Sequence, residues 1–320
     1  MKKILYVVLL LLVLAGCADN GDSEFGFSPY VGGTRGLTMQ FVENSPPSQI
    51  FDGGTYPFAV SVVLENVGEA AIAEGAGFLR IHGINPSEFG ITSADMRQPI
   101  PAMRPVRKST DRSVLDGEIA FVTFSELNYQ KNEPGTFAID NFRVSACYDY
   151  MTRSSSQICI KQDNVDGLRD NEICRVNEPK TSVNSGAPIQ IQNLRQTSMG
   201  QSGIQISFDV VHVGNPRNRW FLEGDAECND IITNQDLFKV EVEVEPIIDG
   251  RYTARCSGGS FNGGNVGEVR LFNGEPRKIV CSFDIGNQDS DFETRANINV
   301  RYRYLEYIEQ RLVINSMGGE

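Results

Sequence analysis

Histidine is scarce in this chain, and basic residues are outnumbered by acidic ones. The 320 residues include two histidines, one tryptophan, and 29 basic against 41 acidic residues, which gives a net charge of −12. Such a surplus of negative charge is repelled by nucleic-acid phosphates. Two histidines leave little for histidine-dependent acid–base chemistry, and neither G-x-S-x-G nor H-E-x-x-H is present. We therefore expect no nucleic-acid partner and no enzymatic activity.

Long apolar runs and helical periodicity are also missing. The apolar run Ile4–Val13 is too short to cross a bilayer as a helix, and no second long run follows it. No stretch sustains an apolar stripe at helical spacing over three turns. These absences argue against a membrane-spanning body and against a helical fold.

The N-terminus resembles a bacterial-type lipoprotein signal. Lys2 and Lys3 precede the apolar run, and Leu14-Ala15-Gly16-Cys17 follows it. The resemblance implies that residues 1–16 are a signal peptide, that Cys17 carries lipid, and that the rest is extracytoplasmic and anchored to membrane lipid. Without Lys2 and Lys3 the exported part has 27 basic and 41 acidic residues, a net charge of −14. Attachment must therefore rest on the lipid rather than on anionic headgroups.

Short strand-like runs, punctuated by glycine and proline, occupy the remaining chain. Phe58–Leu64 alternates apolar with small or polar residues, and Lys239–Glu245 alternates valine with charged residues. A period of two is typical of half-buried strands. Many short strands with turn signals between them indicate an all-β fold of the β-sandwich type.

The same strand pattern occurs twice. Phe58–Gly68 matches Ile204–Gly214, and both segments end in Val-Gly. Val144–Tyr150 matches Ile298–Tyr304, so that two tyrosines fall on two tyrosines. The spacing of about 150 residues is too long for a solenoid unit and suits a whole domain. We interpret the pattern as a duplicated β-domain.

Polar segments suggest where the two domains begin and end. We expect two tandem sandwich domains joined by a polar linker and preceded by a flexible tether. The expected ranges are tether 17–36, first domain 37–161, linker 162–186 and second domain 187–316.

Six cysteines follow Cys17, and an even number in an exported chain favours disulfides. Cys147 and Cys159 are both missing from the second copy and lie symmetrically about an expected hairpin turn near Arg153. A hairpin would place them opposite one another. The predicted pairs are Cys147–Cys159, Cys256–Cys281 and Cys174–Cys228, with Cys159–Cys174 as a competitor.

A few side chains are candidates for binding. Arg217, Arg219 and Trp220 combine cationic groups with an aromatic ring and could form a ligand patch, although we favour Trp220 as a core residue at the start of a strand. His212 takes the strand-end place that Asn66 has in the first copy. We therefore expect His212 to satisfy turn backbone rather than to act in catalysis.

Two segments invite a phosphate or metal interpretation. Gly258–Gly267 lacks the Lys-Ser/Thr pair and the following helix of a phosphate loop, so we expect a mobile loop. Asp163–Asp170, with Asp289 and Asp291, offers oxygen ligands for Ca²⁺ but departs from the EF-hand pattern at Val165. We expect no cofactor, with Ca²⁺ as the alternative to a solvated acidic linker.

The strand end Val62–Gly68 carries a family resemblance. Its Asn-Val-Gly resembles the Asn-x-Gly strand end of immunoglobulin-like domains of the CARDB type, and the chain is similar to archaeal surface lipoproteins with two such domains. The resemblance implies a non-catalytic binding, adhesion or spacer module whose partner is a surface protein or a glycan. The alternative is a self-associating structural subunit of an envelope complex or filament.

Overall fold

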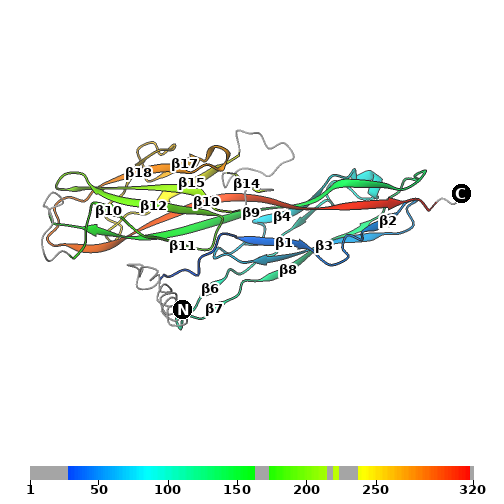
Figure 1. Ribbon diagram of the computed structural model, residues 1–320, viewed down its shortest axis with the longest axis horizontal. Coiled ribbons are helices and arrows are strands. Elements are labelled where there is room, and N and C mark those ends of the chain that lie inside the picture. Colours follow the sequence, from blue (N-terminus) through cyan, green and yellow to red (C-terminus); the bar gives the residue numbers. More distant parts are fainter. Residues whose placement is uncertain (1–27, 163–172, 215–218, 223–236, 318–320) are drawn as a thin grey trace, which may run out of the picture.

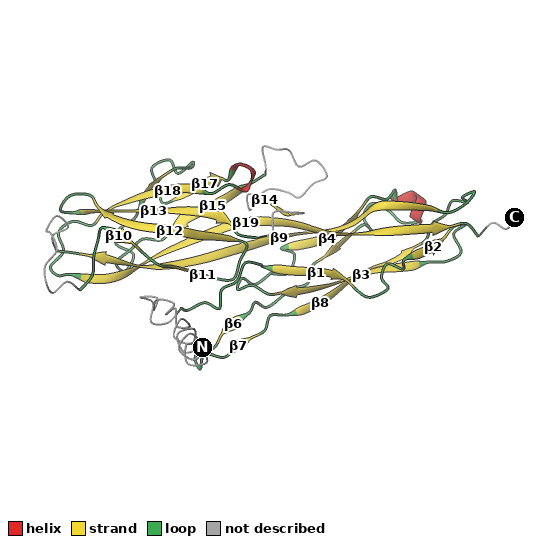
Figure 2. Ribbon diagram, viewed as in Figure 1, coloured by secondary structure: helices red, strands yellow, loops and turns green. Residues whose placement is uncertain are grey.

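The computed structural model describes residues 28–162, 173–214, 219–222 and 237–317, and these residues form an all-β structure (Figures 1 and 2). Its strands form several antiparallel sheets. The described residues contain no α-helix, only the short 3-10 helices η1 (Pro86–Phe89) and η2 (Phe272–Gly274). None of these described helices is long and apolar enough to cross a membrane.

Two very long strands run side by side along the length of the molecule (Figure 1). They are β9 (Phe137–Ile160) and β19 (Phe292–Asn315), each of 24 residues. They pair antiparallel from Phe292 opposite Ile160 to Ile314 opposite Phe137, with one irregularity between Gln310 and Leu312. Together they form the centre of the largest sheet.

The largest sheet is symmetric in strand order about this central pair. Its order is β17-β15-β19-β9-β4-β5, so that each long strand is followed outward by two shorter ones. β2, β11 and β14 add short pairings to the long strands. The shorter strands are β2 (Gln49–Phe51), β4 (Gly77–His82), β5 (Arg97–Pro99), β11 (Ser182–Asn184), β14 (Arg219–Leu222), β15 (Lys239–Val244) and β17 (Val266–Arg270).

Two smaller sheets complete the fold, one in each copy of the repeat. Their orders are β1-β3-β8 and β10-β12-β13-β18-β16, and a separate hairpin pairs β6 with β7. The strands are β1 (Leu37–Phe41), β3 (Phe58–Asn66), β6 (Arg107–Lys108), β7 (Val114–Leu115), β8 (Ile119–Leu127), β10 (Glu178–Pro179), β12 (Ile189–Ser198), β13 (Gly203–His212), β16 (Arg255–Ser257) and β18 (Arg277–Asp284).

The internal repeat read from the sequence is present in the structure. β3 and β13, which contain the matched segments, lie at equivalent places in β1-β3-β8 and β12-β13-β18. Alternate residues of each are buried, as in Val60 and Val62 of β3 and Ile204 and Ile206 of β13. The period of two therefore directs one face of each strand into a core.

The two copies are interlocked rather than arranged in tandem. The hairpin expected near Arg153 does not form, because β9 continues straight through this position and finds a partner in β19 along its length. The far end of β19, at Val313–Asn315, pairs in parallel with β2 of the first copy. Each long strand thus contributes to both copies, so a boundary at residue 161 or 187 does not separate two independent bodies.

The expected tether and linker are partly built into this body. The carboxylate of Glu69 accepts hydrogen bonds from the backbone of Val31 and Gly32, both at 2.9 Å, and of Gly186 at 2.7 Å. In the linker, β11 pairs with Ser154–Ser156 of β9. The backbone N–H and C=O groups of β9 that face away from β19 need hydrogen-bond partners. Backbone groups of a polar segment can provide them as well as those of an apolar segment.

Four tyrosines are buried where the two copies meet. Tyr148 and Tyr150 of β9 lie directly opposite Tyr304 and Tyr302 of β19. Neighbouring ring centroids are 5.8–6.3 Å apart, and each ring is at most 4% exposed. Buried tyrosines require hydrogen-bond partners for their hydroxyl groups. Those partners come from both copies.

The hydroxyl partners follow the repeat. Tyr150 donates to Asn66 at 3.4 Å, and Tyr304 is bonded at 2.9 Å to His212, which has the place of Asn66 in the second copy. The repeat also relates Thr152 to Glu306. Tyr302 is hydrogen-bonded to Thr152 at 3.1 Å, whereas Tyr148 donates to Glu306 at 3.0 Å. The cluster therefore has approximate two-fold symmetry, broken by one buried carboxylate.

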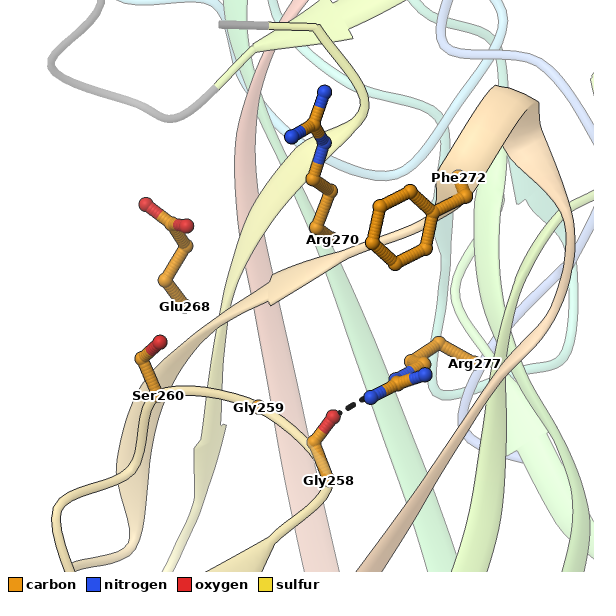
Figure 3. A pocket seen from close by; sticks show the side chains of 7 residues that line it. All are labelled: Gly258, Gly259, Ser260, Glu268, Arg270, Phe272 and Arg277. Carbon is orange, nitrogen blue, oxygen red and sulfur yellow. Dashed lines mark hydrogen bonds between the residues drawn. The ribbon is translucent and has the colours of Figure 1, made fainter. Parts of the chain in front are cut away.

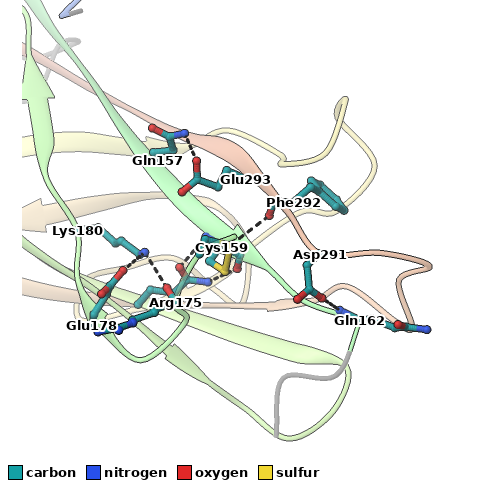
Figure 4. The surroundings of a disulfide bond; sticks show 11 residues. Gln157, Cys159, Gln162, Arg175, Glu178, Lys180, Asp291, Phe292 and Glu293 are labelled. Carbon is teal, nitrogen blue, oxygen red and sulfur yellow. Dashed lines mark hydrogen bonds and ion pairs between the residues drawn. A yellow bond between two sulfur atoms is a disulfide. The ribbon is translucent and has the colours of Figure 1, made fainter. Parts of the chain in front are cut away.

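The disulfides correct part of the sequence interpretation. Cys159 bonds to Cys174, with a Cα–Cα distance of 5.6 Å (Figure 4). The predicted bonds Cys147–Cys159 and Cys174–Cys228 are therefore wrong. Because β9 is continuous, Cys147 and Cys159 lie on one strand about 40 Å apart, far beyond bridging distance. Cys147 is itself disulfide-bonded, and Cys228 lies outside the described residues.

The other described bond is Cys256–Cys281, the pairing expected from the sequence. The two residues lie opposite one another in β16 and β18, with a Cα–Cα distance of 4.0 Å. This bond fixes β16 to the edge of the second copy's smaller sheet.

The tyrosine cluster should be intolerant of added volume at Gly68. A Cβ there would lie 2.1 Å from the hydroxyl of Tyr150 and 2.5 Å from the carbonyl oxygen of Gly186. We expect Gly68→Ala to lower the free energy of unfolding by about 3 kcal/mol in urea titrations. Gly135→Ala is the matched control, because a Cβ there meets nothing within 4 Å. Equal stability of the two variants would contradict this packing.

The Cys159–Cys174 bond closes a loop with a sequence separation of 15. Replacing both cysteines with serine should lower the free energy of unfolding by about 3 kcal/mol, because the loop gains freedom mainly in the unfolded state. Peptide mapping without reduction should recover the Cys159 and Cys174 peptides joined. Recovery of joined Cys147 and Cys159 peptides would instead restore the hairpin interpretation.

Candidate functional site

A hollow of about 280 Å³ lies beside the tyrosine cluster and contains part of the predicted ligand patch. It is formed by the end of β13, by β14 and by η2 with the residue that follows it. The described residues that line it are His212, Gly214, Arg219, Trp220, Phe238, Asn273, Gly274 and Glu275. The structure thus brings His212 together with Arg219 and Trp220, whereas Arg217 lies outside the described residues.

Arg219 is held by a buried carboxylate. Its Nε donates to Glu306 at 2.9 Å, and the Glu306 side chain is 5% exposed. Burial raises the pKa of Glu306, while the charge of Arg219 and the hydrogen bond from Tyr148 act in the opposite direction. Removing one partner of such a pair leaves an uncompensated buried charge. Arg219 is therefore engaged by the interior and contributes little free charge to the hollow.

His212 has a structural role, but the partner shown is a tyrosine hydroxyl rather than the turn backbone expected from its place in the repeat. Its Nε2 is hydrogen-bonded to the hydroxyl of Tyr304, and its ring lies 5.2 Å from that of Phe221. Burial, with the charge of Arg219 as a smaller cause, lowers the pKa of His212 to about 4. The imidazole is thus neutral at pH 7, and its Nε2 is occupied by a core hydroxyl group.

Trp220 lies against another aromatic ring at the margin of the hollow. It stacks on Tyr307 with ring centroids 5.7 Å apart and an interplanar angle of 19°. The guanidinium of Arg143 lies 3.8 Å from the centroid of the same Tyr307 ring. Trp220 is half-buried, so it is neither a core residue nor an open platform. The cation over a ring described here is therefore Arg143 on Tyr307, not Arg217 or Arg219 on Trp220 as predicted.

A second hollow lies at the glycine-rich segment (Figure 3). Its volume is about 390 Å³, and Arg277 closes one side by donating to the carbonyl oxygen of Gly258 at 2.9 Å. Gly258 has φ +102°, and a Cβ there would lie 2.5 Å from the carbonyl oxygen of Lys278. The glycine thus permits close packing against β18. This contact differs from the mobile loop expected from the sequence.

The calcium hypothesis gains no support from the described residues. Asp163–Asp170 lies outside them, and Asp291 accepts a hydrogen bond from the backbone of Gln162 at 2.9 Å. No group of three histidine, cysteine or acidic side chains in the described part of the chain is placed to hold a metal ion.

Sequence reasoning missed Glu306 and Glu69. Both are acidic residues that accept hydrogen bonds from distant parts of the chain. The repeat offered a signal for Glu306, because it stands where the first copy has Thr152. A carboxylate in place of a core hydroxyl predicts a compensating cation nearby, and Arg219 is that cation.

Comparison with known proteins identifies the N-terminus. Residues 1–18 match the family model for the prokaryotic membrane lipoprotein lipid attachment site. The protein is a lipid-anchored, extracytoplasmic membrane protein. The matched range includes Cys17, which implies that an acylated cysteine is the anchor.

Curated proteins and solved structures add little to this assignment. No curated protein matches the chain. A secreted serine protease, VesC from Vibrio cholerae, is similar at 12% identity and a TM-score of 0.18 over 83% of this chain, which spans 50% of the VesC chain. The serine-rich repeat adhesion glycoprotein Srr1 from Streptococcus agalactiae is similar at 8% identity and a TM-score of 0.15, over 91% of this chain and 100% of that one. Such low TM-scores carry no argument about fold or function.

The depressed pKa of His212 predicts a pH-dependent stability. In the unfolded chain histidine takes up a proton near its ordinary pKa of 6.5, whereas His212 in the fold does so only at about 4. Stability is therefore lost as the pH falls from about 6.5 to about 4, by at most about 3 kcal/mol. His212→Asn, which copies Asn66, should remove most of this loss.

The measurement is the free energy of unfolding by urea at pH 7 and at pH 4.5, for wild type and variant. Carboxylates titrate in both proteins, so the difference between the two pH responses isolates His212. Identical pH responses would show that His212 is not held neutral by the fold.

Proposed function

We propose that this lipoprotein is a non-catalytic spacer and binding module that displays recognition loops outside the membrane. Each copy is assigned to the immunoglobulin-like, CARDB-type class suggested by the strand end at Asn66. The partner is a surface protein or a glycan. The pairing of β9 with β19 supports this proposal most directly.

This pairing makes a long and stiff body, which we call the bar. A strand of 24 residues extends about 80 Å, and the two strands are hydrogen-bonded along nearly all of this length. A flexible linker between two separate domains would let their relative orientation vary, whereas two shared strands couple them. Such a body can hold the loops at its two ends at a fixed distance and orientation relative to one another.

The attachment point supports display from both ends. The carboxylate of Glu69 holds Val31 and Gly32 next to Gly186. Figure 1 shows this part of the chain entering the body near its middle, whereas the loops at the ends of β9 and β19 lie far to either side. The first described residues of the chain thus join the body near its centre.

The titratable side chains beside the hollow are engaged in the protein interior, which supports binding rather than catalysis. His212 and Glu306 beside the 280 Å³ hollow are both engaged with buried tyrosines. General acid–base catalysis needs a group that can reach a substrate and exchange protons with it. Recognition by loops carried on a rigid scaffold needs no such group.

Hydrogen exchange and cross-linking test the two parts of the proposal. If the bar is rigid, amides near Tyr150 and Tyr302 should exchange at rates set by global unfolding. On intact cells, cross-links to another envelope protein or to a glycopeptide should come from loops at the ends of the bar. Exchange of the central amides as fast as that of loops would refute the spacer role, and links confined to the central region would refute display from the ends.

A further inference from the structure

The first copy has an open sheet edge at β8. The order β1-β3-β8 leaves β8 paired on one side only, and Figure 1 shows it along the lower margin of this copy. Among the described residues, no backbone hydrogen bond between Ile119 and Ser125 reaches the other side. An edge strand presents unpaired N–H and C=O groups that can template pairing with another strand.

The outer face of β8 carries two large exposed apolar side chains, and its regular part has no charged residue. Ile119 and Phe121 are 57% and 68% exposed, while the alternate residues Val122 and Phe124 are buried. Ile119–Ser125 contains no charged residue, proline or glycine. Natural edge strands are normally blunted by lysine, proline or a covering segment.

The second copy provides an internal comparison. There the equivalent edge strand, β18, is covered by β16, which pairs antiparallel with it and is fixed by Cys256–Cys281. On its outer face Lys278 lies 3.8 Å from Asp209, where the first copy pairs Phe121 with Val63. The first copy thus has an apolar pair in place of a charged one, and no covering strand among the described residues.

We infer that β8 is a self-association surface that pairs antiparallel with β8 of a second copy of this chain. This inference goes beyond the proposed spacer role and does not depend on it. β16 illustrates how the occupant would bind, because the same edge of the second copy accepts an antiparallel strand. Two anchored bars joined in this way form a continuous sheet across the two-fold axis.

Charge favours a second copy as the partner. In an antiparallel pair centred on Thr123, residues Phe121–Ser125 of the two copies would face one another, and none of them is charged. No like charges therefore face one another there, and these pairs are apolar or neutral. Lipid anchoring also confines every copy to one surface, which raises the effective concentration for pairing.

A bilayer is the less suitable occupant of the same surface. Open sheet edges do not enter the hydrocarbon region, because their backbone groups find no hydrogen-bond partners there. Membrane binding by this face is thus an outcome that would overturn the inference.

Cross-linking of the full-length, membrane-anchored protein tests the pairing. Thr123→Cys places a thiol on the outer face near the centre of β8, so two copies would bring their thiols within about 8 Å. A short bismaleimide should then give a covalent dimer. Val280→Cys is the matched control, because Val280 and Thr123 pair with the equivalent residues Ser207 and Ser61. We expect at least tenfold less dimer from the control.

A second pair of variants separates pairing from misfolding. Phe121→Lys, added to Thr123→Cys, should reduce the dimer at least tenfold, because lysine on an edge strand opposes pairing with another strand. Phe272→Lys alters an aromatic residue that is 59% exposed in the second copy, and should leave the dimer unchanged. The inference fails if Thr123→Cys gives no more dimer than Val280→Cys, if it cross-links to a different protein or is shielded by the bilayer, or if Phe121→Lys has no effect.

Discussion

The antiparallel pairing of β9 with β19 is the constraint on which the rest of the structure depends. Their backbone hydrogen bonds place Tyr148 opposite Tyr304 and Tyr150 opposite Tyr302, so the four rings form one buried cluster between the copies. Each hydroxyl group then needs a partner in a low-dielectric interior. Asn66, His212, Thr152 and Glu306 meet that need, and their positions follow from the pairing.

The approximate symmetry of this cluster explains residues that would otherwise invite a functional interpretation. His212 is neutral and bonded to Tyr304 because Asn66 performs the same task for Tyr150. Glu306 replaces a threonine and is compensated by Arg219. The symmetry thus accounts in structural terms for the buried ion pair and for the lowered pKa of His212. The divergence at β8, where an apolar face replaces a charged one, has no such internal compensation among the described residues.

Several features could be predicted from local sequence patterns. Alternation in Phe58–Leu64 predicts a half-buried strand, and the lipobox at Cys17 predicts lipid anchoring, since both depend on contiguous residues. The matched segments predicted the duplication and the equivalence of Asn66 and His212. The hairpin near Arg153 was wrong because a strand's partner is chosen by distant residues. The disulfide predictions based on that hairpin failed with it.

The sequence by itself determined the membrane address, the all-β class and the existence of two related copies. Each follows from residue order, period or repetition along the chain. Only the tertiary structure decided that the copies share two long strands, that Cys159 meets Cys174, and that Arg219 faces Glu306 rather than solvent. The physical reason is that backbone ladders, disulfides and buried charges are satisfied between segments far apart in sequence, and local patterns carry no record of which segments meet.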